Sequence, residues 1–150
     1  MISGPVPRLA ALAVLTDGDR VLLARRENRP DAGLWGFPGG KVELGETLFD
    51  AAIRELEEET TLRARAVHVI DNLDVIRRNA DGQLQMHFHL VAVLCADAVG
   101  KVKASDDVSE ADWHKVSAVL GGHLALSKDV DRVLRRALEF QAAFQAVAGS

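Results

Sequence analysis

Gly40 to Leu62 reads GKVELGETLFDAAIRELEEETTL, a glycine-containing turn that leads directly into a sequence with helical features. Within the expected helix, Glu55, Glu58 and Glu59 fall within an arc of roughly 100° on one exposed face, because each residue turns an α-helix by about 100°. The stretch therefore predicts a row of three carboxylates beside a glycine-rich turn.

Three carboxylates this close together repel one another, and a divalent cation bound among them offsets that cost. Oxygen ligands and retained water suit Mg²⁺ best, with Mn²⁺ as an alternative ion. The other interpretation is a solvated acidic helix face, which is what most runs of charge are. The spacing of the residues around the glutamates decides between the two.

The fixed positions of this stretch resemble the signature sequence of the Nudix hydrolases. They are Gly40, Glu46, Arg54 to Glu59 and Leu62. The resemblance implies an α/β fold, a Nudix-like α/β/α sandwich with a mixed sheet, in a single domain over residues 1–150. It also implies an enzyme, a pyrophosphohydrolase that acts on acid anhydrides in phosphorus-containing compounds.

One position departs from the signature, since Thr61 stands where the family has glycine. That glycine normally ends the helix in a left-handed conformation, which a β-branched threonine enters only at a cost of roughly 1 kcal/mol or more. We therefore expect the helix to end differently here. The departure changes none of the expected metal ligands.

The resemblance also implies the metal ligands and the catalytic groups. By position in the signature, Glu55, Glu58 and Glu59 are the candidate metal ligands, together with the carbonyl of Gly40. Glu55 is also the first candidate for the general base, although the sequence leaves open which carboxylate acts. Arg54 precedes Glu58 by four residues, a spacing that lets it pair with that carboxylate and orient it, with a surface ion pair as the alternative.

A further carboxylate is expected outside the helix. Members of the family commonly supply one more acidic residue from a loop, six positions before a tryptophan, and that spacing from Trp113 falls on Asp107. We expect Asp107 to act in catalysis, with Asp106 and Glu110 as the other candidates. A solvated acidic loop is the alternative.

Four residues are candidates for substrate binding. Arg25 and Arg26 stand at the end of an expected strand, where guanidinium groups can hold phosphate by paired hydrogen bonds, and solvated strand-end arginines are the alternative. Trp35 and Phe37 lie in an expected loop, where their rings could stack on a base. Core packing is the alternative for both rings.

A looser resemblance points to the substrate class. Leu22 to Gly45 looks like the short Nudix enzymes described as ADP-ribose pyrophosphatase-like. We expect cleavage of nucleoside diphosphates linked to a second group, which releases a nucleoside monophosphate and the phosphorylated remainder. Hydrolysis of ordinary or oxidised dNTPs and coenzyme A pyrophosphatase activity are alternatives. A Nudix-like module that senses a nucleotide without cleaving it is the non-enzymatic alternative.

Composition limits the partners and the compartment. The 150 residues carry a formal net charge of −4, which argues against a general nucleic-acid or anionic-membrane binder. We expect a small nucleotide as the partner, and a homodimer stays open. The single cysteine, Cys95, cannot form an internal disulfide, so we expect a reducing, cytoplasmic location.

Apolar runs and turn signals predict the remaining elements. We expect a flexible arm at Met1–Pro7, strands at Leu9–Thr16 and Arg20–Arg26, a loop over Glu27–Gly39, a hairpin of Ala66–Arg77 and Gln85–Ala96, short strands at Val99–Lys103 and Ala111–His114, and a final helix from Ser127 onward.

The helix that carries the glutamates has its own start signal and apolar face. Thr47, with Asp50 three residues later, predicts a helix that begins at Leu48. We expect Phe49, together with Ile53 and Leu56, to form the stripe that anchors this helix to the rest of the fold.

Overall fold

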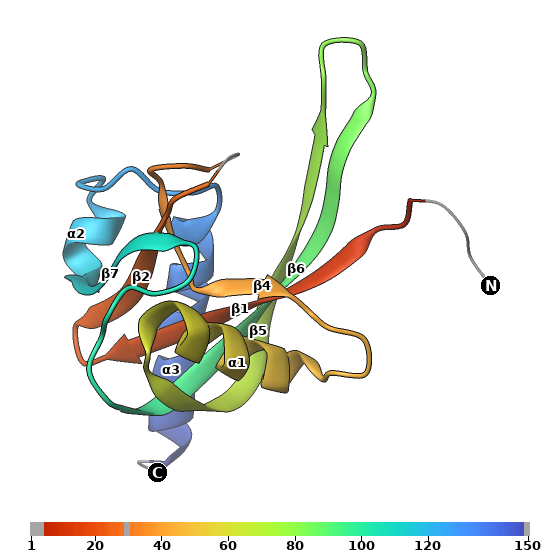
Figure 1. Cartoon of the computed structure of the whole chain (residues 1–150). Coiled ribbons are helices and arrows are strands. Elements are labelled where there is room, and N and C mark those ends of the chain that lie inside the picture. The colour runs from red at the N-terminus through yellow and green to blue at the C-terminus, as the bar shows by residue number, and fades with distance from the viewer. Residues whose placement is uncertain (1–4, 29–30, 149–150) are drawn as a thin grey trace.

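The computed structural model describes residues 5–28 and 31–148. The elements shown in Figure 1 are, in chain order, β1 (Arg8–Asp17), β2 (Arg20–Arg26), β3 (Trp35–Gly36), β4 (Gly39–Lys41), α1 (Leu48–Thr60), β5 (Arg63–Arg78), β6 (Leu84–Val99), β7 (Val108–Lys115), α2 (Val116–Leu120) and α3 (Val130–Ala148). Residues 5–7 of the expected arm are exposed and belong to no strand or helix, and the rest of that arm lies outside the described residues.

The strands form a seven-stranded mixed sheet. Neighbouring strands follow the order β3-β2-β1-β6-β5, with β4 also paired to β1 and β7 to β2. β1 and β6 run parallel from the pair Arg8 and Phe88 to the pair Leu15 and Cys95, whereas β1–β2, β1–β4, β2–β3, β2–β7 and β5–β6 are antiparallel.

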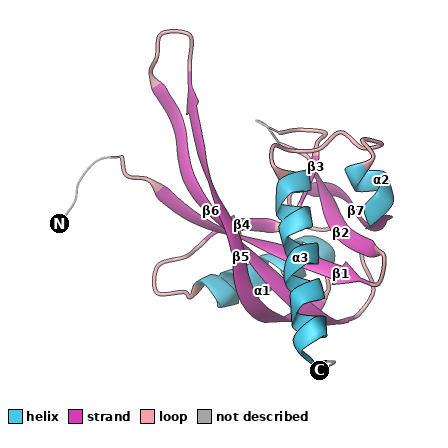
Figure 2. Cartoon of the chain, turned by 180° about the vertical axis from the view of Figure 1, so that it is seen from behind, coloured by secondary structure: helices cyan, strands magenta, loops and turns pink. Residues whose placement is uncertain are grey.

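Helices cover both faces of this sheet, with α1 on one face in Figure 1 and α3 on the other in Figure 2. β1 shows the reason, because successive residues of a strand point to opposite faces. Ala11, Ala13 and Leu15 belong to the core beneath α1, and Val14 belongs to the core beneath α3. The α/β/α sandwich is therefore confirmed.

α1 begins at the expected residue. The hydroxyl oxygen of Thr47 accepts a hydrogen bond of 3.1 Å from the backbone N–H of Asp50, which satisfies a donor that the helix itself leaves unpaired. The expected apolar stripe is confirmed at Leu56, which is fully buried with Ala52 beside it, and is wrong at Phe49, which is 38% exposed.

Both expected strand pairs at the start and middle of the chain are confirmed. β1 and β2 cover Leu9–Thr16 and Arg20–Arg26, and the hairpin of β5 and β6 is longer than the sequence predicts. The expected loop over Glu27–Gly39 is wrong in part. Trp35–Gly36 pairs with β2, and Gly39 begins β4, which pairs with β1. Short strands made of glycine and aromatic residues carry no period that a sequence pattern can detect.

The expected strand at Val99–Lys103 is wrong. β6 ends at Val99, and Gly100 has a φ of 110°, a backbone conformation that ends the ladder. The expected strand at Ala111–His114 is confirmed as part of β7, which begins earlier, at Val108.

The final helix is confirmed but begins later than expected, at Val130. Ser127 is not its side-chain cap, because the buried hydroxyl of Ser127 has no hydrogen-bond partner among the described residues. The short helix α2, which follows β7 directly, was not expected.

Thr61 ends α1 in the left-handed conformation after all. Its φ is 64° and its ψ is 3°, and its backbone N–H donates to the carbonyl of Glu57 at 2.9 Å. The expectation that the helix ends differently here is therefore wrong. The Thr61 hydroxyl donates to the carbonyl of Lys101 at 2.7 Å, and this bond offsets the steric cost that glycine would avoid.

We predict that Thr61→Val lowers the free energy of unfolding by about 1 kcal/mol, because it keeps the strained backbone and removes the hydroxyl. Thr61→Gly removes the strain and the hydroxyl together and should lie between the two proteins. Urea unfolding followed by circular dichroism measures all three. Equal stability of wild type and Thr61→Val would show that the hydroxyl does not compensate for the strain.

Candidate functional site

Two of the three expected carboxylates are buried rather than exposed. Glu55 and Glu59 retain 9% and 5% of their accessible surface, because Gly39 and Gly40 of β4 lie against them. The backbone N–H of Gly39 donates to Glu59 Oε2 at 3.0 Å. The expected exposed face is therefore wrong for this pair, and only Glu58, with 45% of its side chain exposed, faces solvent.

β4 reaches the helix this closely because Gly40 has no side chain. A Cβ on Gly40 would lie 2.6 Å from the Glu55 carboxyl carbon. A Cβ on Gly39 would collide with the backbone carbonyl of Ala11 in β1. β4 pairs with β1 at these same residues, so the sheet holds this strand against the inward face of α1.

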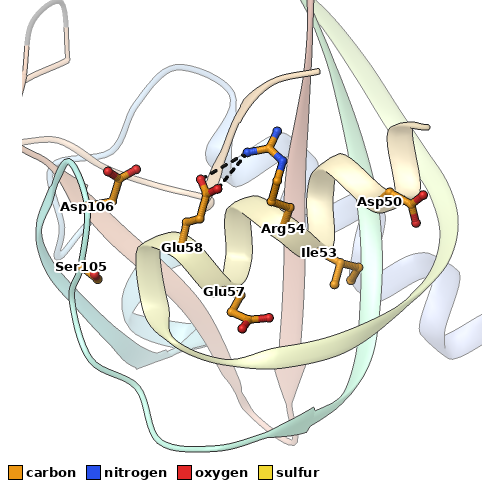
Figure 3. A pocket seen from close by; sticks show the side chains of 7 residues that line it. All are labelled: Asp50, Ile53, Arg54, Glu57, Glu58, Ser105 and Asp106. Carbon is orange, nitrogen blue, oxygen red and sulfur yellow. Dashed lines mark hydrogen bonds and ion pairs between the residues drawn. The ribbon is translucent and has the colours of Figure 1, made fainter. Parts of the chain in front are cut away.

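Arg54 connects the carboxylates along the outer side of the helix. Its guanidinium donates to Glu46 at 2.8 Å and 2.9 Å, to Glu55 at 2.9 Å and to Glu58 at 3.2 Å and 3.3 Å. The expected pairing with Glu58 is present, and Figure 3 shows it as dashed lines. Glu46 also accepts from the backbone N–H of Glu43, as a residue that braces this loop does.

These contacts, together with burial, shift the pKa values of the carboxylates in the cluster. The hydrogen bonds from Arg54 and from the Glu43 backbone hold the pKa of Glu46 at about 2. Burial raises the pKa of Glu55, although Arg54 opposes the rise, and burial raises the pKa of Glu59 to about 8. Glu55 and Glu59, which we call the inward pair, therefore lie where a negative charge is poorly solvated.

Asp107, directly before β7, acts electrostatically on Glu55 and Glu59, and Arg26, the last residue of β2, acts on Glu59. The charge of Asp107 contributes to the raised pKa of both Glu55 and Glu59, and the charge of Arg26 lowers the pKa of Glu59. The backbone carbonyl of Asp107 accepts from the N–H of Glu27, directly after β2. The structure thus brings the expected Asp107 to the carboxylates of α1.

The loop that carries Asp107 is fixed to the end of α1. The N–H groups of Lys103 and Ser105 donate to the carbonyls of Thr60 and Glu59, at 2.9 Å and 3.0 Å. Of the other acidic candidates, Asp106 lines a groove on the outer side of the helix, and Glu110 pairs with Arg25 at 3.1 Å.

The chemistry of these oxygen donors suits a divalent cation, but their arrangement here does not form a complete site. Among the described residues, no group of three or more His, Cys, Asp or Glu side chains is arranged to hold an ion. Glu58 is turned toward Arg54, and Glu59 accepts from Gly39. Burial nonetheless leaves two adjacent carboxylates whose ionisation is disfavoured, and a bound cation would reverse that penalty.

An open groove of about 950 Å³ runs along the outer side of α1 (Figure 3). Asp50, Ile53, Arg54, Glu57, Glu58, Ser105 and Asp106 line it. The groove shares Arg54 and Glu58 with the carboxylate cluster but does not include Glu55 or Glu59. It borders the inward pair and is not itself the candidate site.

A smaller pocket of about 120 Å³ lies on the α3 side of the sheet. Its apolar wall includes Phe37, Leu73 and Leu90, and its polar residues are Arg26, Asp31, Asp74, Arg77, Ser127, Lys128 and Asp129. Arg26 therefore belongs to this pocket and also acts on Glu59 across the end of β2. This volume is well below the roughly 300–1,000 Å³ of pockets that hold whole drug-sized ligands, so it suits one ring system.

The other expected substrate-binding residues lie in different surroundings. Arg25 is engaged with Glu110 and with the carbonyl of Gly33. Trp35 and Phe37 are both buried in the core beneath α3, which is the packing alternative, and Phe37 also contributes to the small pocket. The Trp35 ring meets the His114 ring edge to face, with 4.6 Å between centroids.

Sequence patterns missed three residues of the small pocket. Asp31 and Arg77 form an ion pair of 3.0 Å that joins the β2–β3 loop to β5. Ser127 places a hydroxyl there that has no hydrogen-bond partner among the described residues. The pair is 46 residues apart in the chain, so no local pattern could have found it.

Comparisons with known proteins identify the family and several relatives of this chain. The model of the NUDIX domain matches residues 6–137. An ADP-ribose pyrophosphatase from Methanocaldococcus jannaschii is 31% identical over 107 residues, which are 71% of this chain but only 61% of that relative. An oxidized purine nucleoside triphosphate hydrolase from Mus musculus is 28% identical over 112 residues, 75% of this chain and 69% of the relative.

A solved structure is similar over a larger share of the chain. The NUDIX domain of Shewanella oneidensis NrtR, in complex with ADP ribose, has a TM-score of 0.74 and is 26% identical. The match covers 92% of this chain and 90% of that one.

The two adjacent glycines should respond differently to the same change. Gly40→Ala places a methyl group against the Glu55 carboxylate. Because this carboxylate is the end of a flexible side chain, we expect a folded protein of near-native melting temperature. Because the carboxylate is displaced, we expect the hydrolytic rate to fall at least about tenfold. Gly39→Ala places it against the β1 backbone and should cost about 1–3 kcal/mol of stability. Differential scanning calorimetry with a hydrolysis assay separates them, and full activity in Gly40→Ala would contradict the assignment of Glu55.

We predict that Asp107→Asn lowers the catalytic rate by about tenfold or more with little change in KM, because the loss of its charge alters the field at Glu55 and Glu59 but leaves the loop intact. Asp106→Asn, one residue away, is the matched control and should retain its rate. If both variants keep wild-type kinetics, this loop is only a solvated acidic segment.

Proposed function

This chain belongs to the NUDIX domain family, and we propose that it is a metal-dependent hydrolase of the pyrophosphate linkage in nucleoside diphosphates joined to a second group, as in ADP-ribose. The observation that carries the proposal is the buried pair of carboxylates, Glu55 and Glu59, held against Gly39 and Gly40 of β4. Carboxylates that are shielded from water and lie near a third acid, Asp107, are suited to bind cations. The bound cations would in turn bind an anionic substrate.

The proposed metal-binding residues are Glu55, Glu58, Glu59 and the carbonyl of Gly40. Mg²⁺, with Mn²⁺ as an alternative, would neutralise the charge of the pyrophosphate when bound there. Glu58 can leave its exposed bonds with Arg54 at little cost, since exposed ion pairs contribute about 0–1 kcal/mol. Three carboxylates and one carbonyl then offer the hard oxygen donors that these ions prefer.

Glu55 is the proposed general base. Arg54 holds Glu55 Oε1 at 2.9 Å, which leaves Oε2 to accept a proton from the attacking water. Arg54 is in turn fixed by Glu46 and by the carbonyl of Lys41, so it acts as a positioning residue.

The pocket on the α3 side is the proposed site for the base or sugar of the substrate. Three basic residues (Arg26, Arg77, Lys128) and three acidic ones (Asp31, Asp74, Asp129) line it, so its formal charges cancel. A neutral group with hydrogen-bonding atoms suits such a pocket better than a further phosphate does. The free hydroxyl of Ser127 and the ring of Phe37 offer a polar and an apolar contact to that group.

The names of the relatives support two candidate substrate classes. The M. jannaschii relative is described as an ADP-ribose pyrophosphatase, and the S. oneidensis domain was solved with ADP ribose, which together favour nucleoside diphosphate-linked compounds. The M. musculus relative, an oxidized purine nucleoside triphosphate hydrolase, favours oxidised nucleoside triphosphates as the second candidate. Coenzyme A is ranked below both, because its additional phosphate has no matching excess of positive charge in the small pocket.

A nucleotide sensor without catalytic activity is the non-enzymatic alternative. All the expected carboxylates are present and two are shielded from water, whereas a sensor could dispense with them.

Among the described residues no helix is long and apolar enough to span a membrane. We propose a cytoplasmic location, in keeping with the single, buried cysteine thiol of Cys95.

The substrate proposal is tested by initial rates with Mg²⁺ over ADP-ribose, dinucleoside polyphosphates, nucleotide sugars, coenzyme A and oxidised and ordinary dNTPs. We expect ADP-ribose or a related compound to have the highest kcat/KM, with a nucleoside monophosphate and a phosphorylated remainder as products. A preference of more than about tenfold for dNTPs, roughly 1.4 kcal/mol of transition-state binding, would reverse the order. Tight nucleotide binding without turnover would support the sensor.

A separate prediction concerns Glu59 and pH. Folding raises its pKa from 4.5 to about 8, so between these values the unfolded chain releases the proton first and the metal-free fold loses stability as pH rises. Glu59→Gln cannot ionise and should escape this loss, so its melting temperature in chelator should exceed that of wild type increasingly toward pH 8. It should also be hydrolytically inactive.

Glu57→Gln, on the exposed side of α1, is the matched control for this experiment and should follow the wild-type pH profile with full activity. Parallel melting curves for wild type and Glu59→Gln across this pH range would contradict the burial of an ionisable carboxyl at the site.

A further inference from the structure

The small pocket on the α3 side has walls from three parts of the chain. They are residues 73–77 of β5, residues 127–130 at the start of α3, and Asp31, Gly36 and Phe37 from the segment between β2 and β4. These parts are far apart in the sequence, so the shape of the pocket depends on the bonds that join one wall to the next.

Two of the three joints consist of several bonds. The backbone of Trp35 is hydrogen-bonded twice to the segment before α3, including a bond of 2.9 Å from the N–H of Ser127 to the carbonyl of Trp35. The guanidinium of Arg132 joins α3 to β5, since it donates to the carbonyl of Asn72 at 3.3 Å and lies 3.5 Å from the carboxylate of Asp71. These two joints hold α3 against both of the other walls.

The third joint, between the β2–β3 loop and β5, is one ion pair. The guanidinium of Arg77 donates to the carboxylate of Asp31 at 3.0 Å. Among the described residues, no other hydrogen bond or ion pair connects this loop to β5. The side chains of Asp31 and Arg77 are 19% and 45% exposed, so the pair is better shielded from water than a fully exposed one.

Neither partner has another fixed support at this point. The carbonyl of Asp31 accepts from the N–H of Leu34 at 3.0 Å, a bond that stays inside the loop. Arg77 is paired with Met86 of β6, beyond Phe88, the first residue of β6 that pairs with β1. The hairpin of β5 and β6 is two-stranded there and extends past the body of the molecule (Figures 1 and 2), and such a ribbon is only marginally stable by itself.

We propose that Asp31 and Arg77 act together as positioning residues, which hold the β2–β3 loop against β5 and so keep the small pocket in the shape that binds the ring of the substrate. The opposite charges cancel within the pair, so it shapes the pocket without adding net charge beside a neutral ring. This inference rests on the proposed function for the nature of the ligand, but not for the role of the pair in the fold.

Charge reversal with steady-state kinetics on ADP-ribose and Mg²⁺ tests whether the two residues act through each other. Asp31→Arg and Arg77→Asp each place like charges together and should raise KM at least about fivefold, whereas kcat should change by less than about twofold because the carboxylates of α1 are untouched. The double variant Asp31→Arg/Arg77→Asp restores opposite charges and should return KM to within about twofold of wild type.

Arg65→Asp is the matched control, because it disrupts an exposed ion pair of 3.0 Å with Asp97, elsewhere on β5, and should leave KM unchanged. A double variant with a KM as high as that of the single variants would overturn the proposal, since each residue would then act on the substrate separately. Equal KM values in wild type and both single variants would also overturn it.

Hydrogen exchange of the ligand-free proteins, followed by NMR, tests the pair without any catalysis. The N–H groups of Gly33 and Leu34, which donate to the carbonyls of Arg26 and Asp31, should exchange about tenfold faster in each single variant and at the wild-type rate in the double variant. The N–H of Ala13, bonded inside the body of the protein, is the internal control.

The two measurements separate this proposal from the proposed function. Unchanged exchange at Gly33 and Leu34 in the single variants would overturn the role of the pair even in an active hydrolase. A protein that hydrolyses none of the compounds, but whose loop loosens in the single variants and recovers in the double variant, would refute the proposed function and support the role of the pair.

Discussion

The close approach of β4, at Gly39 and Gly40, to the inward face of α1 is the contact on which the site depends. A side chain at Gly39 would collide with β1, and one at Gly40 would collide with the carboxylate of Glu55. The approach shields Glu55 and Glu59 from water and raises the pKa of both. Two acidic side chains in such surroundings favour a cation between them, and an anionic substrate can follow that cation.

The sheet separates this chemistry from the small pocket, and Arg26 connects the two. It lies at the end of β2, lines the pocket on the α3 side and acts electrostatically on Glu59 on the α1 side. Neighbouring Arg25 is held by Glu110 and Gly33 and cannot serve both sides in the same way. A substrate with a ring in the pocket and a pyrophosphate near Glu59 would therefore pass Arg26.

Local sequence was sufficient for the helix and its carboxylates but not for their burial. The cap at Thr47 depends on residues three positions apart, so a pattern detects it. The burial of Glu59 depends on β4, a strand of three residues that only its pairing with β1 defines. Thr61 shows a similar limit, because the bond to Lys101 that supports its left-handed conformation spans 40 residues.

The most direct measurement of the central claim is an anomalous difference map from a crystal of the wild-type protein grown with Mn²⁺. The account predicts a peak bounded by the carboxylates of Glu55 and Glu59 and by the carbonyl of Gly40, with Glu58 released from Arg54. A map without a peak there at saturating Mn²⁺, with Glu58 still bound to Arg54 and Glu59 still accepting from the N–H of Gly39, would contradict it.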